Sequence, residues 1–118
     1  MKISREKAFE IAKVLYSKGG EDILLLHVED MTIIADYFVI CTGRSGVQVK
    51  ALSDHVEDKL AEDEITVIRK EGYNAGRWVV LDYSDVLVHI MLDEEREFYN
   101  IERLWVSGTN TVDFLEEE

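Results

Sequence analysis

A short apolar run that leads through a glycine turn into a capped helix is the feature that most constrains this fold. Tyr37 to Thr42 has the composition of a buried strand, and Gly43 ends it. Ser45 to Gln48 then matches a capping box, which predicts a helix that fades near residues 62–63. A third strand is expected at residues 65–69. Two strands joined by a helix of this length predict a right-handed parallel crossover, and therefore an α/β domain.

The other periodic segments complete a single domain. Ser4 is the expected N-cap of a first helix that stops at Gly19-Gly20, and Asp93 is the expected cap of a last helix. The last helix should bury a face made of Phe98, Ile101, Leu104 and Trp105. Further strands are expected at Ile23 to Val28, Trp78 to Leu81 and Val86 to Met91. The sequence thus predicts a mixed sheet of about five strands with helices packed on it, over residues 1–106. Residues 107–118 are predicted to form an acidic, mobile C-terminal tail.

The charge of the chain restricts its partners. It carries 25 acidic and 13 basic side chains, for a net charge of -12. Such a surface repels phosphate backbones, so extensive nucleic-acid binding is not expected. It suits a basic protein partner, although acidity that serves only solubility or a salt-adapted or heat-adapted source explains the composition equally well.

Neither a cofactor nor a metal is expected. Cys41 is the single cysteine, which excludes an intramolecular disulfide and a four-cysteine zinc site. His27, His55 and His89 have no metal-ligand spacing. No signal peptide is visible, and the longest apolar run, Ile23 to Leu26, is far too short to cross a bilayer. We therefore expect a cytoplasmic protein that is not an enzyme and does not bind membranes.

An enzymatic alternative centres on the turn before the second helix. A glycine and a serine at a helix start, here Gly43 and Ser45, are how nucleotidyltransferase folds begin their active site, and a helix N-terminus can hold a phosphate. Those enzymes also need two aspartates separated by one residue on the next strand, and residues 65–69 offer none. Asp82 and Asp85 are the nearest candidates, so a nucleotidyltransferase-like enzyme or a nucleotide-binding protein stays the alternative.

The hairpin around residues 82–85 has two different faces. If Leu81 pairs with Val86, and Val79 with Val88, one face is wholly aliphatic and suits the core. The opposite face would carry an aromatic and aliphatic cluster with Trp78 opposite His89, made of Trp78, Val80, Leu87, His89 and Met91. Such a cluster is typical of protein interfaces, and a covering helix is the equally good alternative.

Three ordered motifs resemble the ribosomal silencing factor family, also called Iojap. They are Ala35 to Ser45 with Gln48-Val49, then Glu71-Gly72 with Gly76 to Ile90, and finally Arg96, Phe98-Tyr99, Ile101-Glu102 and Leu104-Trp105. The family often has Gly where this chain has Ser84, so the hairpin tip can differ.

The resemblance implies a nucleotidyltransferase-like fold without catalytic carboxylates. It also implies binding to protein fourteen of the large ribosomal subunit, a steric block of subunit association, and lower translation when nutrients are scarce. Members can self-associate when free, and a purely structural dimer is a third, weaker alternative. By position in the hairpin, the candidate partner-binding residues are Trp78, Val80, Asp82, Tyr83, Asp85, His89 and Met91.

Overall fold

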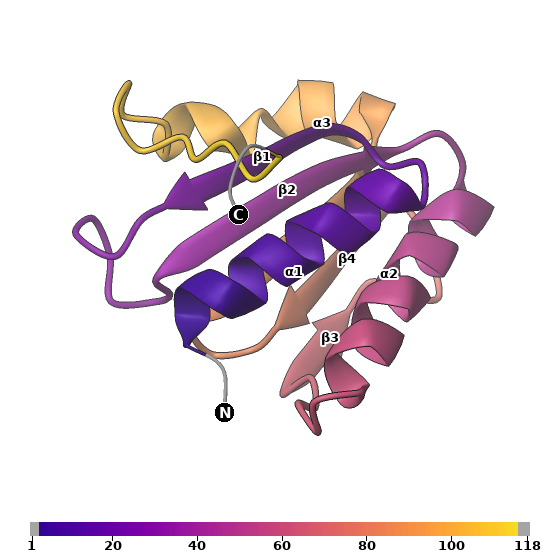
Figure 1. The fold of residues 1–118 in the computed structure, drawn as a ribbon. Coiled ribbons are helices and arrows are strands. Elements are labelled where there is room, and N and C mark those ends of the chain that lie inside the picture. Colours follow the sequence, from indigo (N-terminus) through magenta and orange to yellow (C-terminus); the bar gives the residue numbers. More distant parts are fainter. Residues whose placement is uncertain (1–2, 116–118) are drawn as a thin grey trace.

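A five-stranded mixed sheet with the strand order β1-β2-β5-β4-β3 forms the centre of the protein (Figure 1). The computed structural model describes residues 3–115. The strands are β1 Glu21–His27, β2 Tyr37–Gly43, β3 Arg69–Glu71, β4 Trp78–Asp82 and β5 Val86–Leu92. The helices are α1 Ser4–Ser17, α2 Gly46–Ala61, α3 Asp93–Tyr99 and the 3₁₀-helix η1 Ile101–Leu104. Only β2 and β5 pair in parallel, and the other neighbours are antiparallel. The predicted α/β domain with about five strands is therefore confirmed.

Helices α1 and α2 lie side by side on one face of the sheet (Figure 1). Their stripes of apolar residues, among them Ile11, Leu15, Leu52 and Val56, are buried there. The strands contribute the residues that alternate toward this side, including Val39, Val79, Leu81, Val88 and Ile90. Burial of this face removes a large apolar area from water and is the main source of stability.

The other face of the sheet is covered over only half of its width. Helices α3 and η1 lie behind the sheet in Figure 1, against β2 and β5. Ile101 and Trp105 pack there on a second cluster that includes Phe38, Ile40 and Met91. Among residues 3–115, Tyr99 of α3 reaches Trp78 of β4, and no helix lies over β3 on this face (Figure 1).

The prediction that the strand after α2 pairs in parallel with β2 is wrong. The strand parallel to β2 is β5, and β3 begins only at Arg69 and pairs with β4. Ile65 and Val67 are half-buried against the core outside any strand. The continuous aliphatic strand β5 takes the central position, whereas the charged triplet Arg69–Glu71 suits a sheet edge.

Three helix boundaries differ from the predictions. Leu92, and not Asp93, is the N-cap of α3. Ile3, and not Ser4, is the N-cap of α1, because the Glu6 carboxylate accepts the backbone N–H of Ile3 at 3.2 Å. The last helix breaks at Asn100, whose φ of 44° is left-handed. The predicted cap of α2 is confirmed, since Ser45 Oγ accepts the backbone N–H of Gln48 at 3.1 Å.

The C-terminal segment returns to the edge of the sheet. Val112 donates its N–H to the carbonyl of Leu25 at 2.8 Å, and Thr111 forms a bridge with Leu26. Phe114 is 7% exposed and packs edge-on against Tyr16 of α1. The division at residues 106 and 107 stays a prediction, but residues 110–114 are not a free tail. Glu116 to Glu118 lie outside the described residues. Within residues 3–115, no helix is long and apolar enough to span a membrane.

Candidate docking surface

The hairpin pairs in a register shifted by two residues from the predicted one. Leu81 lies opposite Val88, and Val79 opposite Ile90, so the aliphatic face is buried under α1 and α2 as expected. Trp78 lies opposite Met91 instead of His89, and Val80 lies opposite His89. The shift arises because Tyr83, Ser84 and Asp85 form the connection, where Tyr83 donates its N–H to the carbonyl of Val86 at 3.0 Å.

On the side of the sheet opposite α1 and α2, we call the part over β3, β4 and the first half of β5 the open sheet face; α3 reaches its margin, where Tyr99 contacts Trp78. It is formed by the side chains of β4 and β5 that alternate away from α1 and α2, namely Trp78, Val80, Asp82, Leu87 and His89. Trp78, Val80, Asp82 and Leu87 are half-buried, so each keeps part of its surface in water. Arg69 and Glu71 of β3 continue the same side of the sheet to its edge, opposite Asp82 and Val80.

The indole of Trp78 is held from two sides. Its Nε1–H donates a hydrogen bond to Nδ1 of His89 at 3.1 Å, and the Tyr99 ring lies 5.0 Å from it between centroids. His89 is 9% exposed and contacts the Phe38 ring edge-to-face at 5.9 Å. Burial lowers the pKa of His89 to about 4, so the ring is neutral at pH 7. An aromatic side chain that is rigid before binding loses little entropy when a partner covers it.

Three predicted contact residues are buried: His89 keeps 9% of its surface exposed, and the other two, Met91 and Tyr83, keep almost none. Met91 is 0% exposed and belongs to the cluster under η1, because its position on β5 lies beneath the covered half of the face. Tyr83 is 3% exposed and packs into the core on the side of α1 and α2, where burial also raises the pKa of its hydroxyl. In this conformation neither side chain can form a substantial contact with a partner.

The hairpin tip is fixed by ionic and polar contacts. Asp85 is paired with Lys7 of α1 at 2.8 Å, and its carbonyl accepts the backbone N–H of Asp36 at 2.8 Å. Asp82 Oδ1 accepts the backbone N–H of Ser84, which has a φ of 78°. Asp85 is thus already engaged within the chain, whereas Asp82 faces the open sheet face.

Helix α3 adds aromatic residues that the sequence did not predict at this surface. Phe98 and Leu104, expected to be buried, are 79% and 67% exposed because the helix breaks at Asn100. Phe98 packs against Tyr99, which in turn contacts Trp78. Leu87, Phe98 and Tyr99 therefore join the candidate surface. Only the position of Phe98-Tyr99 in the third sequence motif hinted at this.

The basic side chains near this surface are engaged by carboxylates. Arg77 forms ion pairs with Glu94 and Glu95, and Arg96 is buried between Glu102 and the hydroxyl of Thr42. Arg69, which lies on the face itself, pairs with Glu71 at 4.0 Å. Because these cations are already paired, the acidic residues around the surface set its character. A basic partner is favoured.

The residues of the enzymatic alternative lie at opposite ends of the sheet. Gly43 pairs with Leu92 at one end of β5, and Asp85 precedes Val86 at the other end. Seven residues of strand at about 3.3 Å each separate them by roughly 20 Å. The Ser45 hydroxyl is engaged as the helix cap. Within residues 3–115, no cluster of three or more His, Cys, Asp or Glu side chains could hold a metal ion.

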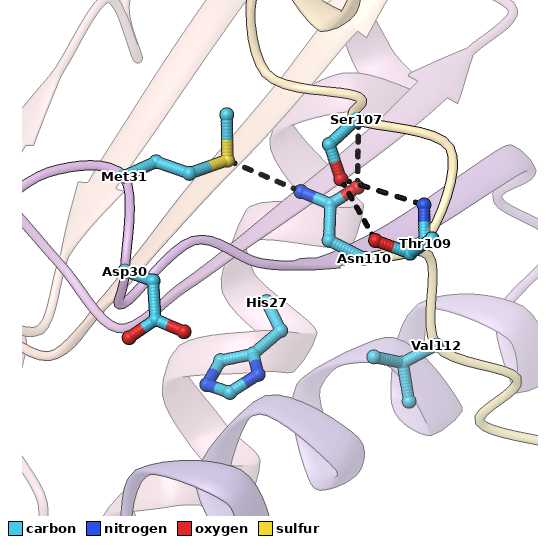
Figure 2. Close-up of a pocket in the computed structure, with 7 residues that line it drawn as sticks. All are labelled: His27, Asp30, Met31, Ser107, Thr109, Asn110 and Val112. Carbon is cyan, nitrogen blue, oxygen red and sulfur yellow. Dashed lines mark hydrogen bonds between the residues drawn. The ribbon is translucent and has the colours of Figure 1, made fainter.

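A separate cavity of about 310 Å³ lies where the C-terminal segment meets the end of β1 (Figure 2). His27 and Asp30 line one side, and the opposite side is formed around Asn110. The Asn110 amide donates to Met31 Sδ at 3.4 Å and to the Trp105 carbonyl at 2.8 Å. Its oxygen accepts the backbone N–H of Ser107 at 2.9 Å. Asn110 therefore fastens the C-terminal segment to the rest of the chain.

Comparison with known proteins identifies the family. The model of the family described as "Ribosomal silencing factor during starvation" matches residues 2–118. The chain belongs to the ribosomal silencing factor family. It is 44% identical to the protein named ribosomal silencing factor RsfS of Bacillus subtilis. The aligned 88 residues cover 75% of each chain. It is 30% identical over 102 residues to the maize chloroplastic protein Iojap, covering 86% of this chain and 44% of that protein.

A solved member of comparable size has the same fold. The crystal structure of protein CV0518 from Chromobacterium violaceum superposes with a TM-score of 0.85 at 34% identity, over 98% of both chains. The resemblance inferred from the three sequence motifs is therefore confirmed at the level of family and fold. A ribosomal silencing factor is a regulator of translation that associates with the ribosome.

Proposed function

We propose that the chain binds protein fourteen of the large ribosomal subunit through the open sheet face and thereby blocks association with the small subunit. The observation that carries this proposal is the half-buried Trp78, fixed by His89 and by Tyr99 of α3 at the margin of the open sheet face. A preorganised aromatic residue in an apolar surface is the usual anchor of a protein interface.

The charge of the chain supports a ribosomal protein as the partner. Ribosomal proteins must neutralise RNA phosphates and are therefore basic, whereas this chain has a net charge of -12. Opposite charges accelerate encounter and orient the two surfaces, and Asp82 and Glu71 flank the apolar centre. The block is steric and needs no chemistry, so the protein is not an enzyme and uses no cofactor.

The test is sedimentation of the tagged protein with separated ribosomal subunits. The protein should migrate with large subunits alone, and fewer joined ribosomes should form as its concentration rises. Trp78→Ala should weaken binding by about 2 kcal/mol or more, roughly a 30-fold loss of affinity. Normal joining of subunits in saturating amounts of the protein would refute the proposal.

A matched control separates binding from folding. Tyr16→Ala removes an exposed aromatic ring from α1, on the other side of the molecule, and should leave binding unchanged. Thermal unfolding followed by circular dichroism should show that Trp78→Ala remains folded. If that variant unfolds instead, Trp78 belongs to the core and the surface assignment is wrong.

We further propose that the protein acts in the cytoplasm under nutrient limitation and that the free chain can pair with a second copy. The exposed apolar side chains of α3 and η1, Phe98 and Leu104, favour such pairing, since burying them removes apolar area from water. Sedimentation equilibrium across a concentration series tests self-association. A strictly monomeric protein at all concentrations would exclude it.

A further inference from the structure

The hydrogen bond between Trp78 and His89 determines which nitrogen of the imidazole carries the proton. An indole nitrogen can only donate, so Nδ1 of His89, 3.1 Å from Nε1 of Trp78, must be the unprotonated acceptor. A neutral imidazole has one N–H, which is then on Nε2. The chain thus selects one tautomer of His89 without a charged neighbour.

The remaining contacts fix the direction of that N–H. The Phe38 ring touches the imidazole edge-to-face from β2, and the Trp78 ring lies 6.0 Å from it on β4. Nε2 has no hydrogen-bond partner among residues 3–115. It is also not among the polar atoms that are fully shielded from solvent without a partner. This nitrogen therefore keeps some exposure to solvent within the small exposed part of the residue, and Val80 is the cross-strand neighbour of His89 on this face.

We propose that His89 is a specificity-determining residue of the docking surface, where its Nε2–H donates a hydrogen bond to a backbone carbonyl oxygen of the bound protein. This inference rests on the proposed function. A donor that is covered by a partner without receiving an acceptor loses its bond to water, and this penalty selects against partners with an apolar group or a donor at that point. A carboxylate acceptor is disfavoured because Asp82 and Glu71 lie on the same face, where the Arg69 guanidinium is already paired with Glu71.

His89 has a second role as a positioning residue for Trp78. Its Nδ1 holds the indole in the orientation that Tyr99 supports from the other side. A substitution that keeps an acceptor and a donor should therefore preserve docking, and one that keeps only the volume should not. His89→Gln and His89→Leu form that pair.

The first experiment needs no ribosome. Long-range proton–nitrogen correlation spectra of the free, nitrogen-15-labelled protein at neutral pH should identify His89 as the Nε2–H tautomer. In Trp78→Phe, which keeps an aromatic ring but has no N–H, the Nδ1 resonance should move because its donor is gone. A protonated Nδ1 in the wild-type protein would overturn the proposal whether or not the protein binds ribosomes.

The second experiment measures affinity for isolated large subunits. His89→Leu and Trp78→Phe should each bind roughly tenfold more weakly or worse, whereas His89→Gln should stay within about threefold of wild type. His55→Gln on α2, beyond the opposite face of the sheet, is the matched control. Thermal unfolding of each variant identifies any variant that fails to fold. If His89→Leu fails to fold, Trp78→Phe keeps the test decisive.

Wild-type affinity in a folded His89→Leu variant would overturn the specificity role. Equal losses in His89→Gln and His89→Leu, with both folded, would also overturn it, because a restored donor and acceptor should rescue binding. If the wild-type protein itself does not bind large subunits, the proposed function fails, and the spectra still decide the tautomer.

Discussion

Acidification from about pH 6.5 toward pH 4 should destabilise this protein through His89. Burial lowers the pKa of His89 from 6.5 to about 4 in the folded state, whereas the unfolded chain has the ordinary value. Because the folded pKa is the lower one, the unfolded state binds more protons between these values. The free energy of unfolding therefore falls as the pH decreases from about 6.5 toward 4.

The magnitude follows from the same two values. With a pKa of about 4 in the folded state and 6.5 in the unfolded state, the contribution of His89 decreases by roughly 2 kcal/mol between about pH 7 and pH 5. His89→Gln, which cannot be protonated, should lack this decrease. Between pH 7 and pH 5, the free energy of unfolding of His89→Gln should therefore fall by about 2 kcal/mol less than that of the wild-type protein.

Urea denaturation followed by far-ultraviolet circular dichroism measures this difference, because the signal does not depend on the environment of Trp78. The two proteins differ only at residue 89, so the difference between their pH profiles isolates His89. If the wild-type protein and His89→Gln lose the same stability between pH 7 and pH 5, His89 is not buried as a neutral ring and the reasoning is wrong.

Two stability predictions concern other parts of the molecule and use the same urea denaturation. Ser84 has a φ of 78°, so Ser84→Gly should raise the free energy of unfolding by about 0.5–1 kcal/mol; an unchanged or lower value would argue against strain at the hairpin tip. Phe114→Ala should lower it by roughly 2–4 kcal/mol, because the ring is buried against α1, whereas Leu115→Ala, at an exposed position, should change it by less than about 0.5 kcal/mol. Equal effects of the last two substitutions would mean that the C-terminal segment is not packed in solution.

The parts of the fold predicted correctly from the sequence are those that local periodicity determines. Alternation along β4 and β5 separates Val79 and Leu81 from Trp78 and Val80 whatever the exact register. The helical stripes of α1 and α2 likewise identify their buried sides. The composition of the two hairpin faces was therefore within reach of sequence reasoning, whereas the exposure of the face with Trp78 was not.

The errors arise where distant segments decide the outcome. Met91 alternates toward the open side but is covered by η1, and only the tertiary arrangement reveals that. The two-residue shift of register follows from the conformation of Ser84, which period-two alternation cannot detect. The left-handed Asn100 turns Phe98 outward, although the spacing of apolar residues across it matches one continuous helix.

The packing of the C-terminal segment on β1 limits how this protein can aggregate. Unpaired strand edges recruit further strands, and a five-stranded open sheet has two such edges. Here residues 110–112 occupy part of the β1 edge, Asp22 distorts the rest with a φ of 49°, and β3 offers only three charged residues. Growth of fibres by strand addition is thus blocked at both ends, and copies of the chain that meet at high concentration must associate through their faces. Cleavage of the chain before Asn110 would remove this protection and convert β1 into a template for misassembly.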